Sequence, residues 1–583
     1  MANLASMATM VNGERGGPYD FVIKSGRIVD GSGMPGFFGD VAVQGGHVAA
    51  VGKVDGPARR TINAEGLVVA PGFIDHHTHM DAQIFWDPIA SASSWHGVTS
   101  IIMANCGLGL APCRPEDHDA LLRTFIRVEA MPRPLLEAGI PWGWQSFAEY
   151  LAAFSARLGV NVGALAGHHP IRRHVLRDDA NQRVATDVEV NEMVQQLRAA
   201  LQAGALGLTT DRNPRHAQED GSPLPGHLAD DREVFALAAE VGRFGAGAIQ
   251  AGGNPAIPPV AWYGDLSLHS GRPVLWQAIN HRWSQPDQWR ADLAATDEQF
   301  KRGARAFGLT FALGIESVRV LSPYTGGFEE LPTWKRVLNM PSLDERKRAL
   351  ADPALRPQLR YEAVEDPKPT VFSKRWDMIR LAGARLPEHQ GFIGKSFVEI
   401  AQAQGKDVID AFLDLNLKED LEAPFKSLGI QGDPEAVGEM LRSPHVVIGE
   451  SDAGAHTQNF ATYGYCTHLL GQYVRERGDL TLEEAVHRLT FAVATLYDIP
   501  SRGLLRPGYA ADIVLFDPDR IGTEEAEWVN DQPAGYGRFV QRATGIEMTI
   551  VNGEVLMERG EHTGTYPGKL LRNAVAEAAR VPA

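Results

Sequence analysis

Between about residues 71 and 500, short apolar runs alternate with amphipathic stretches, and this alternation restricts the fold more than any other feature of the chain. Continuous apolar strands separated by helices are typical of parallel sheets covered on both faces. With the run before His77, eight candidate strands are present, the other seven being VTSIIMANC, VNVGALAGHH, ALGLTTD, GAIQAG, RPVLWQAIN, LTFALGI and HVVIGESDAG. Eight such units close a barrel whose active site lies at the C-terminal ends of the strands. The sequence therefore predicts an α/β fold with a (β/α)8, TIM-like barrel over residues 71–500.

A different sequence pattern occurs at both ends of the chain. Residues 19–70 alternate apolar and polar positions and are interrupted by glycines, and the same pattern returns within residues 501–572 as ADIVLFDP and EMTIVNGEV. Period-two alternation with glycine-rich turns predicts short antiparallel strands. Strands at both ends pair only if the ends meet, so we predict one small β-sandwich domain built from residues 19–70 and 501–572. Residues 1–18 are predicted to form a flexible arm and residues 573–583 a C-terminal tail.

One segment interrupts the barrel pattern. Residues 328–366 contain highly charged helical stretches such as SLDERKRALADPALRPQLRYEA. Long irregular additions to a barrel often carry function near its mouth. We interpret residues 328–366 as an insertion or lid over the barrel.

Composition excludes several classes of protein. The 583 residues are 44% apolar and 22% charged, as in ordinary globular proteins, and no apolar run reaches the length of a membrane span. A net charge of −16 disfavours binding to nucleic acid or to an anionic membrane. Three cysteines and an N-terminus without signal-peptide features favour a reducing cytoplasm without a disulfide framework. We expect a small-molecule partner, and a homo-oligomer is compatible with the sequence.

The strongest motif is PGFIDHHTH, in which His77 and His79 follow an apolar strand. Residues two apart in a strand project from the same face, with Cα atoms about 6–7 Å apart, a span that two imidazoles can close onto one metal ion. Neutral imidazole is a common zinc ligand. The alternative is a solvated histidine-rich turn, which would not need an apolar strand before it.

Asp452 and Cys106 also follow apolar strands, in GESDAGAH and MANCG. A carboxylate at the end of a late strand can take a proton from an activated water. The alternative for Asp452 is a helix cap, and a cysteine at such a position is more often a small buried apolar residue than a ligand.

His168 and His281 end two further candidate strands. Each alone is compatible with hydrogen-bonded packing. Because titratable or ligating residues end the first, second, third, sixth and eighth strands, and these ends converge in a closed barrel, a shared site is the better interpretation.

Taken together, these residues resemble the amidohydrolase superfamily and, more narrowly, the D-aminoacylase (N-acyl-D-amino-acid deacylase) family. The likeness extends from about residue 19 to residue 572. The matching stretches are Pro71–His79, Asn105–Gly107 with Ala111 and Pro112, Gly167 and His168 with Arg172, Ser451 with Asp452, and Leu504–Pro518.

The resemblance implies roles for individual residues. His77, His79, Cys106, His281 and Asp452 would be metal ligands, with Cys106 as a thiolate and Asp452 also as the general base. His168 would act at the substrate, where Arg172, Trp142 and His456 are further expected contacts.

One position departs from the family pattern. The family places a metal-binding histidine at the end of strand five, where this chain has Gln250. A glutamine is a neutral oxygen donor and a poor zinc ligand. We therefore expect one tightly bound Zn²⁺ ion, with a second ion weak or absent.

The resulting prediction is a metal-dependent hydrolase of an N-acyl-D-amino acid or related small N-acyl compound, acting through a metal-activated water and Asp452. The alternatives are a hydrolase of another small amide, cyclic amide or carbamate, and a catalytically inactive, amidohydrolase-like binding protein.

Overall fold

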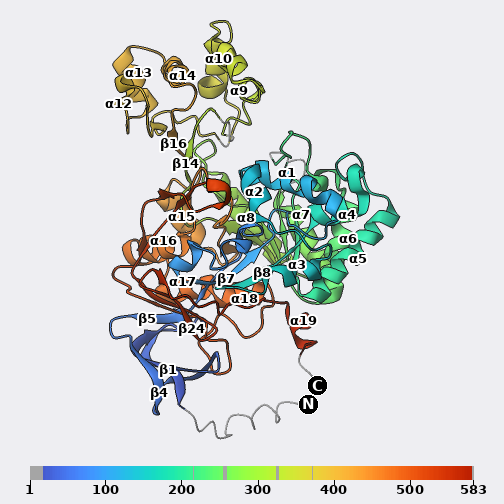
Figure 1. Ribbon diagram of the computed structural model, residues 1–583, viewed down its shortest axis with the longest axis vertical. Helices are drawn as coiled ribbons and strands as arrows, with labels where there is room; N and C mark the ends of the chain where they lie inside the picture. The colour runs from blue at the N-terminus through green and yellow to red at the C-terminus, as the bar shows by residue number, and fades with distance from the viewer. Residues whose placement is uncertain (1–17, 214–215, 254–258, 323–326, 371, 581–583) are drawn as a thin grey trace.

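The chain is arranged along one long axis as a β-sheet region, a central α/β body and a projecting helical unit (Figure 1). The computed structural model describes residues 18–213, 216–253, 259–322, 327–370 and 372–580. Most of the predicted N-terminal arm, residues 1–17, lies outside these ranges.

Strands from both ends of the chain form one nine-stranded sheet. Its central junction pairs β5 antiparallel with β18, with Val69 opposite Leu515. Alternate side chains along these strands are buried in one apolar cluster that contains Ile23, Val41 and Ile550. The strands are β1 (Tyr19–Ile28), β2 (Phe37–Gln44), β3 (His47–Gly52), β4 (Ala58–Asn63), β5 (Val68–Pro71), β18 (Ile513–Phe516), β23 (Ile546–Val551), β24 (Glu554–Glu558) and β25 (Glu561–His562).

The central body contains two parallel sheets. One is ordered β6-β7-β8 and the other β17-β13-β12-β11-β10-β9. Their residues are almost all buried, which explains the continuous apolar runs in the sequence. The strands are β6 (Phe73–Asp75), β7 (Val98–Met103), β8 (Asn161–Ala164), β9 (Ala166–Gly167), β10 (Gly207–Thr210), β11 (Ala248–Ala251), β12 (Val274–Trp276), β13 (Ala306–Thr310) and β17 (Val446–Ile448).

Backbone hydrogen bonds connect the two parallel sheets at both edges. On one side, the Leu206 amide donates to the Ala164 carbonyl at 2.9 Å. On the other, the His79 amide donates to the Ala453 carbonyl at 2.7 Å and the Asp452 amide to the His77 carbonyl at 3.2 Å. These bonds bring the ends of the first and last parallel strands side by side.

Helices follow most of the parallel strands. The helices of the central body are α1 (His118–Val128), α2 (Arg133–Gly139), α3 (Phe147–Phe154), α4 (His168–Leu176), α5 (Asp187–Ala203), α6 (Asp231–Phe244), α7 (Pro259–Ser270), α8 (Gln288–Lys301), α15 (Pro434–Leu441), α16 (Tyr465–His468), α17 (Leu482–Leu489) and α18 (Phe491–Leu496), and α19 (Ala574–Ala578) lies near the C-terminus. Several begin with a side-chain cap. At the start of α5, for example, the Thr186 side chain accepts from the Glu189 amide and Glu189 bonds back, which satisfies amide groups that lack intrahelical partners.

The projecting unit at the top of Figure 1 interrupts the chain between β13 and β17. It has its own apolar cluster, which extends from Leu321 to Phe425. The predicted lid, residues 328–366, therefore shares one apolar core with the longer segment that follows it, up to Phe425. The unit consists of β14 (Glu316–Arg319), α9 (Pro332–Leu338), α10 (Leu343–Ala351), α11 (Arg356–Arg360), β15 (Arg380–Leu381), α12 (Pro387–Gln390), α13 (Phe397–Gln404), α14 (Val408–Lys418) and β16 (Phe425–Leu428).

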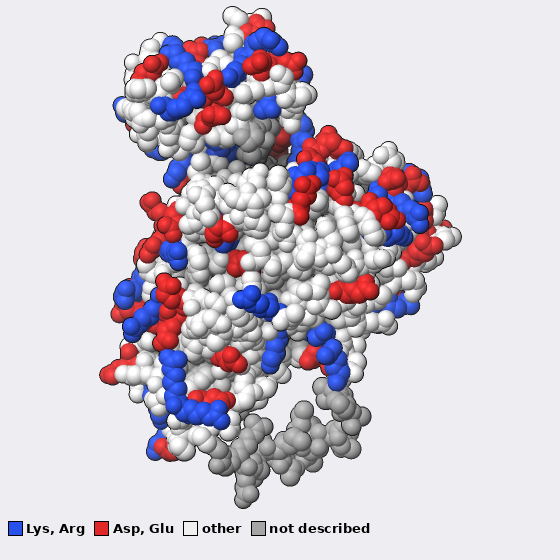
Figure 2. Space-filling view, in the orientation of Figure 1, with Lys and Arg blue, Asp and Glu red and all other residues white. Residues whose placement is uncertain are grey.

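Charged side chains are dense on this projecting unit, where Lys and Arg lie among Asp and Glu (Figure 2). The face of the central body seen in the same view is largely uncharged. Within the described ranges, no helix is both long enough and apolar enough to cross a membrane.

Trp334 is the residue on which we expect the projecting unit to depend most. Its side chain is fully buried, stacks on Phe328 at 4.5 Å and donates from Nε1 to the Leu359 carbonyl at 2.9 Å. Trp334→Ala should lower the free energy of unfolding of this unit by about 3–5 kcal/mol, because the cavity it leaves cannot collapse fully. Hydrogen exchange over residues 321–425 measures the loss, with Trp528→Ala, at a 46% exposed site, as the control. Equal exchange in both variants would contradict this expectation.

Candidate metal centre

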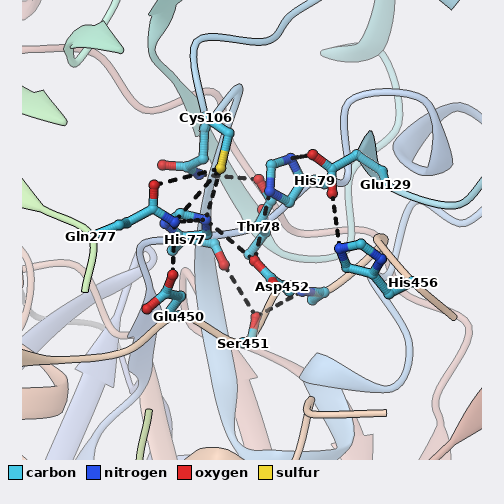
Figure 3. Close-up of polar contacts among 12 residues, drawn as sticks. His77, Thr78, His79, Cys106, Glu129, Gln277, Glu450, Ser451, Asp452 and His456 are labelled. Atoms are coloured by element: carbon cyan, nitrogen blue, oxygen red, sulfur yellow. Dashed lines mark hydrogen bonds and ion pairs between the residues drawn. The ribbon is translucent and has the colours of Figure 1, made fainter. Parts of the chain in front are cut away.

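His77 and His79 lie immediately beyond β6, with both side chains buried. Thr78 between them forms a parallel bridge with Ala453, so the backbone stays extended past the end of the strand. The two imidazoles consequently point to the same side, with ring centroids 5.4 Å apart (Figure 3).

Cys106 occupies a tight turn after β7, with a φ of 53° in the left-handed region. The Asn105 side chain holds this turn by donating to the carbonyl groups of Thr78 and Ile102, each at 3.0 Å. Gly107 follows with φ 73°, where a Cβ atom would lie 2.8 Å from the His169 ring. Asn105 thus holds the turn, and Gly107 is needed because a side chain there would meet the His169 ring. The turn directs the Cys106 thiol toward His77 (Figure 3).

Asp452 joins these three residues from the end of β17. Its Oδ1 atom lies 3.3 Å from His77 Nε2 and 3.6 Å from His79 Nε2. The Cys106 Sγ atom is 3.6 Å from His77 Nε2. The preceding Ser451 is buried and donates its hydroxyl to Asp75 at 2.5 Å, which fixes the loop that carries Asp452.

These separations match the requirements of a tetrahedral metal site. Nitrogen, oxygen and sulfur ligands at about 2.0–2.3 Å from a zinc ion lie about 3.3–3.6 Å from one another. The ligand atoms of His77, His79 and Cys106 all lie within 4.8 Å of each other. The donor set of two imidazoles, one thiol and one carboxylate is chemically suited to zinc.

Glu129 is a buried carboxylate behind His79, at the end of α1. Its Oε1 atom lies 3.5 Å from His79 Nδ1, and its Oε2 atom lies 3.6 Å from His456 Nε2. A carboxylate on the far nitrogen of an imidazole orients the ring and raises its basicity as a ligand. In this structure His79 Nδ1 and Glu129 Oε1 face each other without a hydrogen bond, so Glu129 lies where such a partner would stand but does not itself fix the ring.

Burial shifts the pKa values of the cluster. It raises the pKa of the Cys106 thiol well above its usual value, with the charges of Glu129 and Asp211 adding to the effect. Burial lowers the pKa of His79 to about 3, so this imidazole is neutral at pH 7. For Asp452 burial acts upward, but the hydrogen bond from His77 and the nearby imidazoles bring the pKa down to about 2. At neutral pH the cluster thus contains a carboxylate and a neutral imidazole, while the thiol keeps its proton until a cation displaces it.

Gln250, at strand five, supports His77 from behind. Its Oε1 atom accepts from the Cys106 amide at 3.2 Å and from the Thr209 hydroxyl at 2.8 Å. Its Nε2 atom donates to His77 Nδ1 at 2.8 Å. The Nδ1 atom of His77 is therefore an acceptor, which leaves the ring proton on Nε2, the atom that faces the cluster.

The end of strand six contributes Gln277 to the cluster. Gln277 is the first residue after β12 and contacts both Cys106 and Glu450. His281, predicted as the strand-six ligand, is not brought to this position. Its backbone bonds to Gln431 on both sides, and its ring packs against Trp283 at 4.8 Å. Four residues past Gln277, the chain has already turned away from the cluster, and the structure does not support His281 as a ligand.

His168 and Arg172 form a separate buried network on α4. His168 bonds to Glu233 through Nε2 at 2.7 Å and to Thr210 through Nδ1 at 2.8 Å. Arg172 pairs with the same Glu233 carboxylate and is fully buried. Both nitrogens of His168 are occupied by the protein, and neither His168 nor Arg172 lines the cavity above the cluster. Their predicted contact with substrate is not supported by this placement.

A cavity of about 760 Å³ opens above the cluster. His79, Cys106, Asp452 and His456 line it, and a contact between His456 and substrate stays a prediction. Trp142 is outside it, stacked on His118 at 3.9 Å. The projecting unit contributes to the cavity through Arg319, Gly327, Glu329, Glu330, Phe372 and Ser373.

Sequence reasoning missed several polar residues of this cavity. Glu129 follows a helix, and no strand pattern marks it. Asp211 and His216 bond to each other at 2.5 Å in the loop after β10, and both line the cavity. Glu450 and Gln277 stand at the ends of recognised strands, so the rule that identified Asp452 would also have found them.

The sequence matches a family model described as the amidohydrolase family over residues 60–557, which is most of the chain. The chain belongs to the amidohydrolase family. The D-aminoacylase of Alcaligenes xylosoxydans xylosoxydans is 27% identical over 573 residues, covering 96% of this chain and 99% of that protein. The N-acyl-D-glutamate deacylase of the same organism is 29% identical, with 95% and 96% covered.

A solved structure with the same α/β fold is the N-acyl-D-glutamate deacylase from Bordetella bronchiseptica, complexed with zinc and a phosphonate inhibitor that mimics the tetrahedral intermediate. It is 26% identical, has a TM-score of 0.66, and is matched over 95% of this chain and 100% of that one. The resemblance inferred from the motifs is confirmed.

Gln250→Glu should increase the affinity of the chain for zinc by about 10–100-fold, the usual range for partners of metal-bound histidines. A cation at His77 Nε2 requires the ring proton on Nδ1, which the amide group of Gln250 cannot accept in its present orientation. A carboxylate accepts from the imidazole, from the Cys106 amide and from Thr209 together. Competition with a chelating dye measures the change, and Gln250→Leu, which offers no acceptor, should show no increase. Equal affinities for native protein and Gln250→Glu would contradict the argument.

Proposed function

We propose that the chain is a metal-dependent hydrolase that cleaves the amide bond of an N-acyl-D-amino acid or a related small N-acyl compound. The observation that carries this proposal is the convergence of His77, His79, Cys106 and Asp452 at zinc-like separations. All of these except His77 line the cavity above them. Membership of the amidohydrolase family supports the reaction class, and similarity to the D-aminoacylase and the N-acyl-D-glutamate deacylase supports the substrate class.

The four residues of this cluster would hold one tightly bound Zn²⁺ ion. The chemistry that zinc supplies when bound is an activated water nucleophile and polarisation of the carbonyl group. The neutral imidazole of His79, backed by Glu129, and the thiol of Cys106 supply a nitrogen and a soft sulfur donor.

Asp452 would be the general base. Its carboxylate is ionised at neutral pH and lies at the edge of the cavity, with 15% of the side chain exposed. It would accept a proton from the attacking water and return it to the leaving amine. His456, whose pKa burial lowers to about 4, is neutral at pH 7 and can hydrogen-bond to the substrate beside Asp452.

The remainder of the cavity would select the substrate. Its wall includes the aromatic side chains of Tyr263, Trp276, Phe311 and Phe460, which suit an apolar acyl group. Arg282 and Arg319 line the same cavity, where a guanidinium group suits the carboxylate of an amino acid.

The two parallel sheets would form one closed (β/α)8 barrel. The edge hydrogen bonds from Leu206 to Ala164 and from His79 to Ala453 support this arrangement. In such a barrel the strand ends face one mouth, which accounts for a cluster drawn from the first, second and last strands.

A catalytically inactive binding protein is the second candidate, favoured by Gln250 and Gln277 at the ends of strands five and six. Neutral amides at both positions weaken any second ion. Hydrolysis of another small amide, cyclic amide or carbamate is a variant of the first candidate, because fold and site constrain the reaction more than the substrate.

The deciding experiment screens matched N-acyl-D- and N-acyl-L-amino acids while metal content is measured on the same sample. We expect hydrolysis of D substrates, loss of activity on chelation and recovery with zinc. A metal-free protein without hydrolysis of any amide, cyclic amide or carbamate would favour the binding protein.

Asp452→Asn should reduce kcat by about 10²–10⁴-fold, the usual contribution of a general base. The substitution preserves shape but removes the proton acceptor. Steady-state kinetics and circular dichroism together separate lost chemistry from lost fold. Near-native turnover would show that Asp452 only caps its loop.

Cys106→Ala should remove most of the bound zinc, because alanine offers no donor and the remaining ligands lack the charge of a thiolate. Elemental analysis after gel filtration is the measurement, with Cys466→Ala, at another buried cysteine, as the control. Full zinc retention in Cys106→Ala, or two tightly bound ions in the native chain, would overturn the single-ion site.

A further inference from the structure

His216 is an imidazole in the cavity that the proposed mechanism does not use. It lies in the loop after β10, with 26% of its side chain exposed. Its Nδ1 atom is 2.5 Å from Asp211 Oδ2, the short separation of a charge-assisted hydrogen bond. Its Nε2 atom lies 3.5 Å from the amide nitrogen of Asn213, which is too long for a strong hydrogen bond. The Nε2 atom can therefore bond to a ligand in the cavity.

Asp211 fixes the orientation of this ring. Its side chain is 1% exposed, and its Oδ1 atom accepts from the Asn213 amide at 3.0 Å while Oδ2 bonds to His216. A Cβ atom at Gly252 would lie 1.9 Å from Asp211 Oδ1, so glycine at this position leaves the space that the carboxylate occupies. A buried carboxylate on one ring nitrogen orients an imidazole and stabilises its protonated form.

The end of β10, which carries Asp211, is anchored by hydrogen bonds to its neighbours. The Thr209 hydroxyl accepts from the Gly107 amide at 2.9 Å, next to the turn of the candidate metal centre. The Thr210 hydroxyl bonds to His168 Nδ1 at 2.8 Å. The buried network of His168, which does not line the cavity, thus supports the strand end from which Asp211 and His216 follow.

His216 also stands close to the candidate metal centre. Burial is the main cause of the low pKa values of His79 and His456, about 3 and about 4, and the charge of His216 lowers both further. Charge interactions weaken with distance, so this influence places the His216 ring near both imidazoles. All three residues line the same cavity. An amide bond held at the cluster therefore has His216 beside it.

The mechanism proposed above lacks a side chain that binds the carbonyl oxygen. Asp452 is assigned to the protons of the water and the amine, and both nitrogens of His168 are occupied within the protein. A fixed donor aimed at an oxygen on which negative charge develops contributes about 10²–10³-fold in rate. An imidazolium whose Nδ1 is held by a carboxylate presents its Nε2 proton as such a donor.

We propose that His216 is a catalytic residue, which donates a hydrogen bond from Nε2 to the carbonyl oxygen of the scissile amide, with Asp211 as its positioning residue. The proposal rests on the amide hydrolysis proposed above. His216 keeps its proton throughout: the hydrogen bond strengthens as the carbonyl carbon becomes tetrahedral and weakens again when the amine departs. Both proton transfers remain with Asp452.

Two substitutions separate the two ring nitrogens in the full, zinc-loaded chain. His216→Asn keeps an amide near the position of Nδ1, where it can still bond to Asp211, but places nothing at Nε2. It should lower kcat for N-acetyl-D-amino acids by about 10²–10³-fold with little change in KM. His216→Gln places an amide donor near the position of Nε2 and should recover at least about tenfold of this loss. His269→Asn, at an exposed position on α7, is the control and should behave as the native chain.

Asp211→Asn tests the positioning role. It should lower kcat in the native background and add almost nothing in the His216→Asn background, because its effect is exerted through the imidazole. Independent, additive losses would show that Asp211 does not act through His216.

A phosphonate analogue measures the same hydrogen bond without turnover. In the N-methylphosphonyl derivative of a D-amino acid, a tetrahedral oxyanion replaces the acetyl group. His216→Asn should weaken calorimetric binding of this compound to the zinc-loaded chain by about 10²-fold, and should leave the affinity for the free D-amino acid unchanged. Equal losses for both compounds would show that His216 binds the carboxylate of the ground state, which contradicts the proposal.

The inference is overturned if His216→Asn retains near-native kcat, if its defect lies in KM alone, if His216→Gln recovers nothing, or if phosphonate binding is absent or independent of His216. The proposed function is judged separately by amide hydrolysis in the native chain. Phosphonate binding that depends on His216, without hydrolysis of any N-acyl compound, would refute the proposed function and leave His216 as the donor to a tetrahedral oxyanion.

Discussion

The structure depends on the backbone hydrogen bonds between residues 77–79 and residues 452–453, which join the first and last parallel strands. These two segments are separated by nearly the whole central body and by the projecting unit. Their pairing places Asp452 Oδ1 within 3.6 Å of both imidazoles and supports the loop through the Ser451 to Asp75 hydrogen bond. Without this register, the two motifs would be unrelated parts of the chain.

The second constraint is electrostatic. Glu129, Glu450, Asp452 and Cys106 face one cavity with imidazoles among them, and burial raises the pKa of Glu450 to about 7. Imidazole side chains lie close to these acidic groups. Glu129, for example, lies beside both His79 and His456. A divalent cation bound at the cluster would complete the compensation, because its charge offsets the buried carboxylates.

The projecting unit explains how a common fold acquires a particular cavity. Its own core keeps Arg319, Glu329 and Phe372 in position over the cluster. In the function proposed above, the chemistry lies at the strand ends, and the projecting unit adds part of the wall of a cavity whose aromatic residues Tyr263, Trp276 and Phe311 belong to the central body.

Local pattern was enough to predict the strands of the central body, the β-rich ends, and the candidates His77, His79, Cys106 and Asp452, because each follows an apolar run that must be buried. It did not indicate that the chain turns away between β12 and His281, nor that Glu233 of another helix pairs with His168 and Arg172. It gave no indication of Glu129, which follows a helix. The sequence by itself determined which side chains stand at strand ends, since alternation and burial are local properties. Only the tertiary structure decided which of them share a cavity, because that depends on strand order and on loop paths that no local pattern encodes.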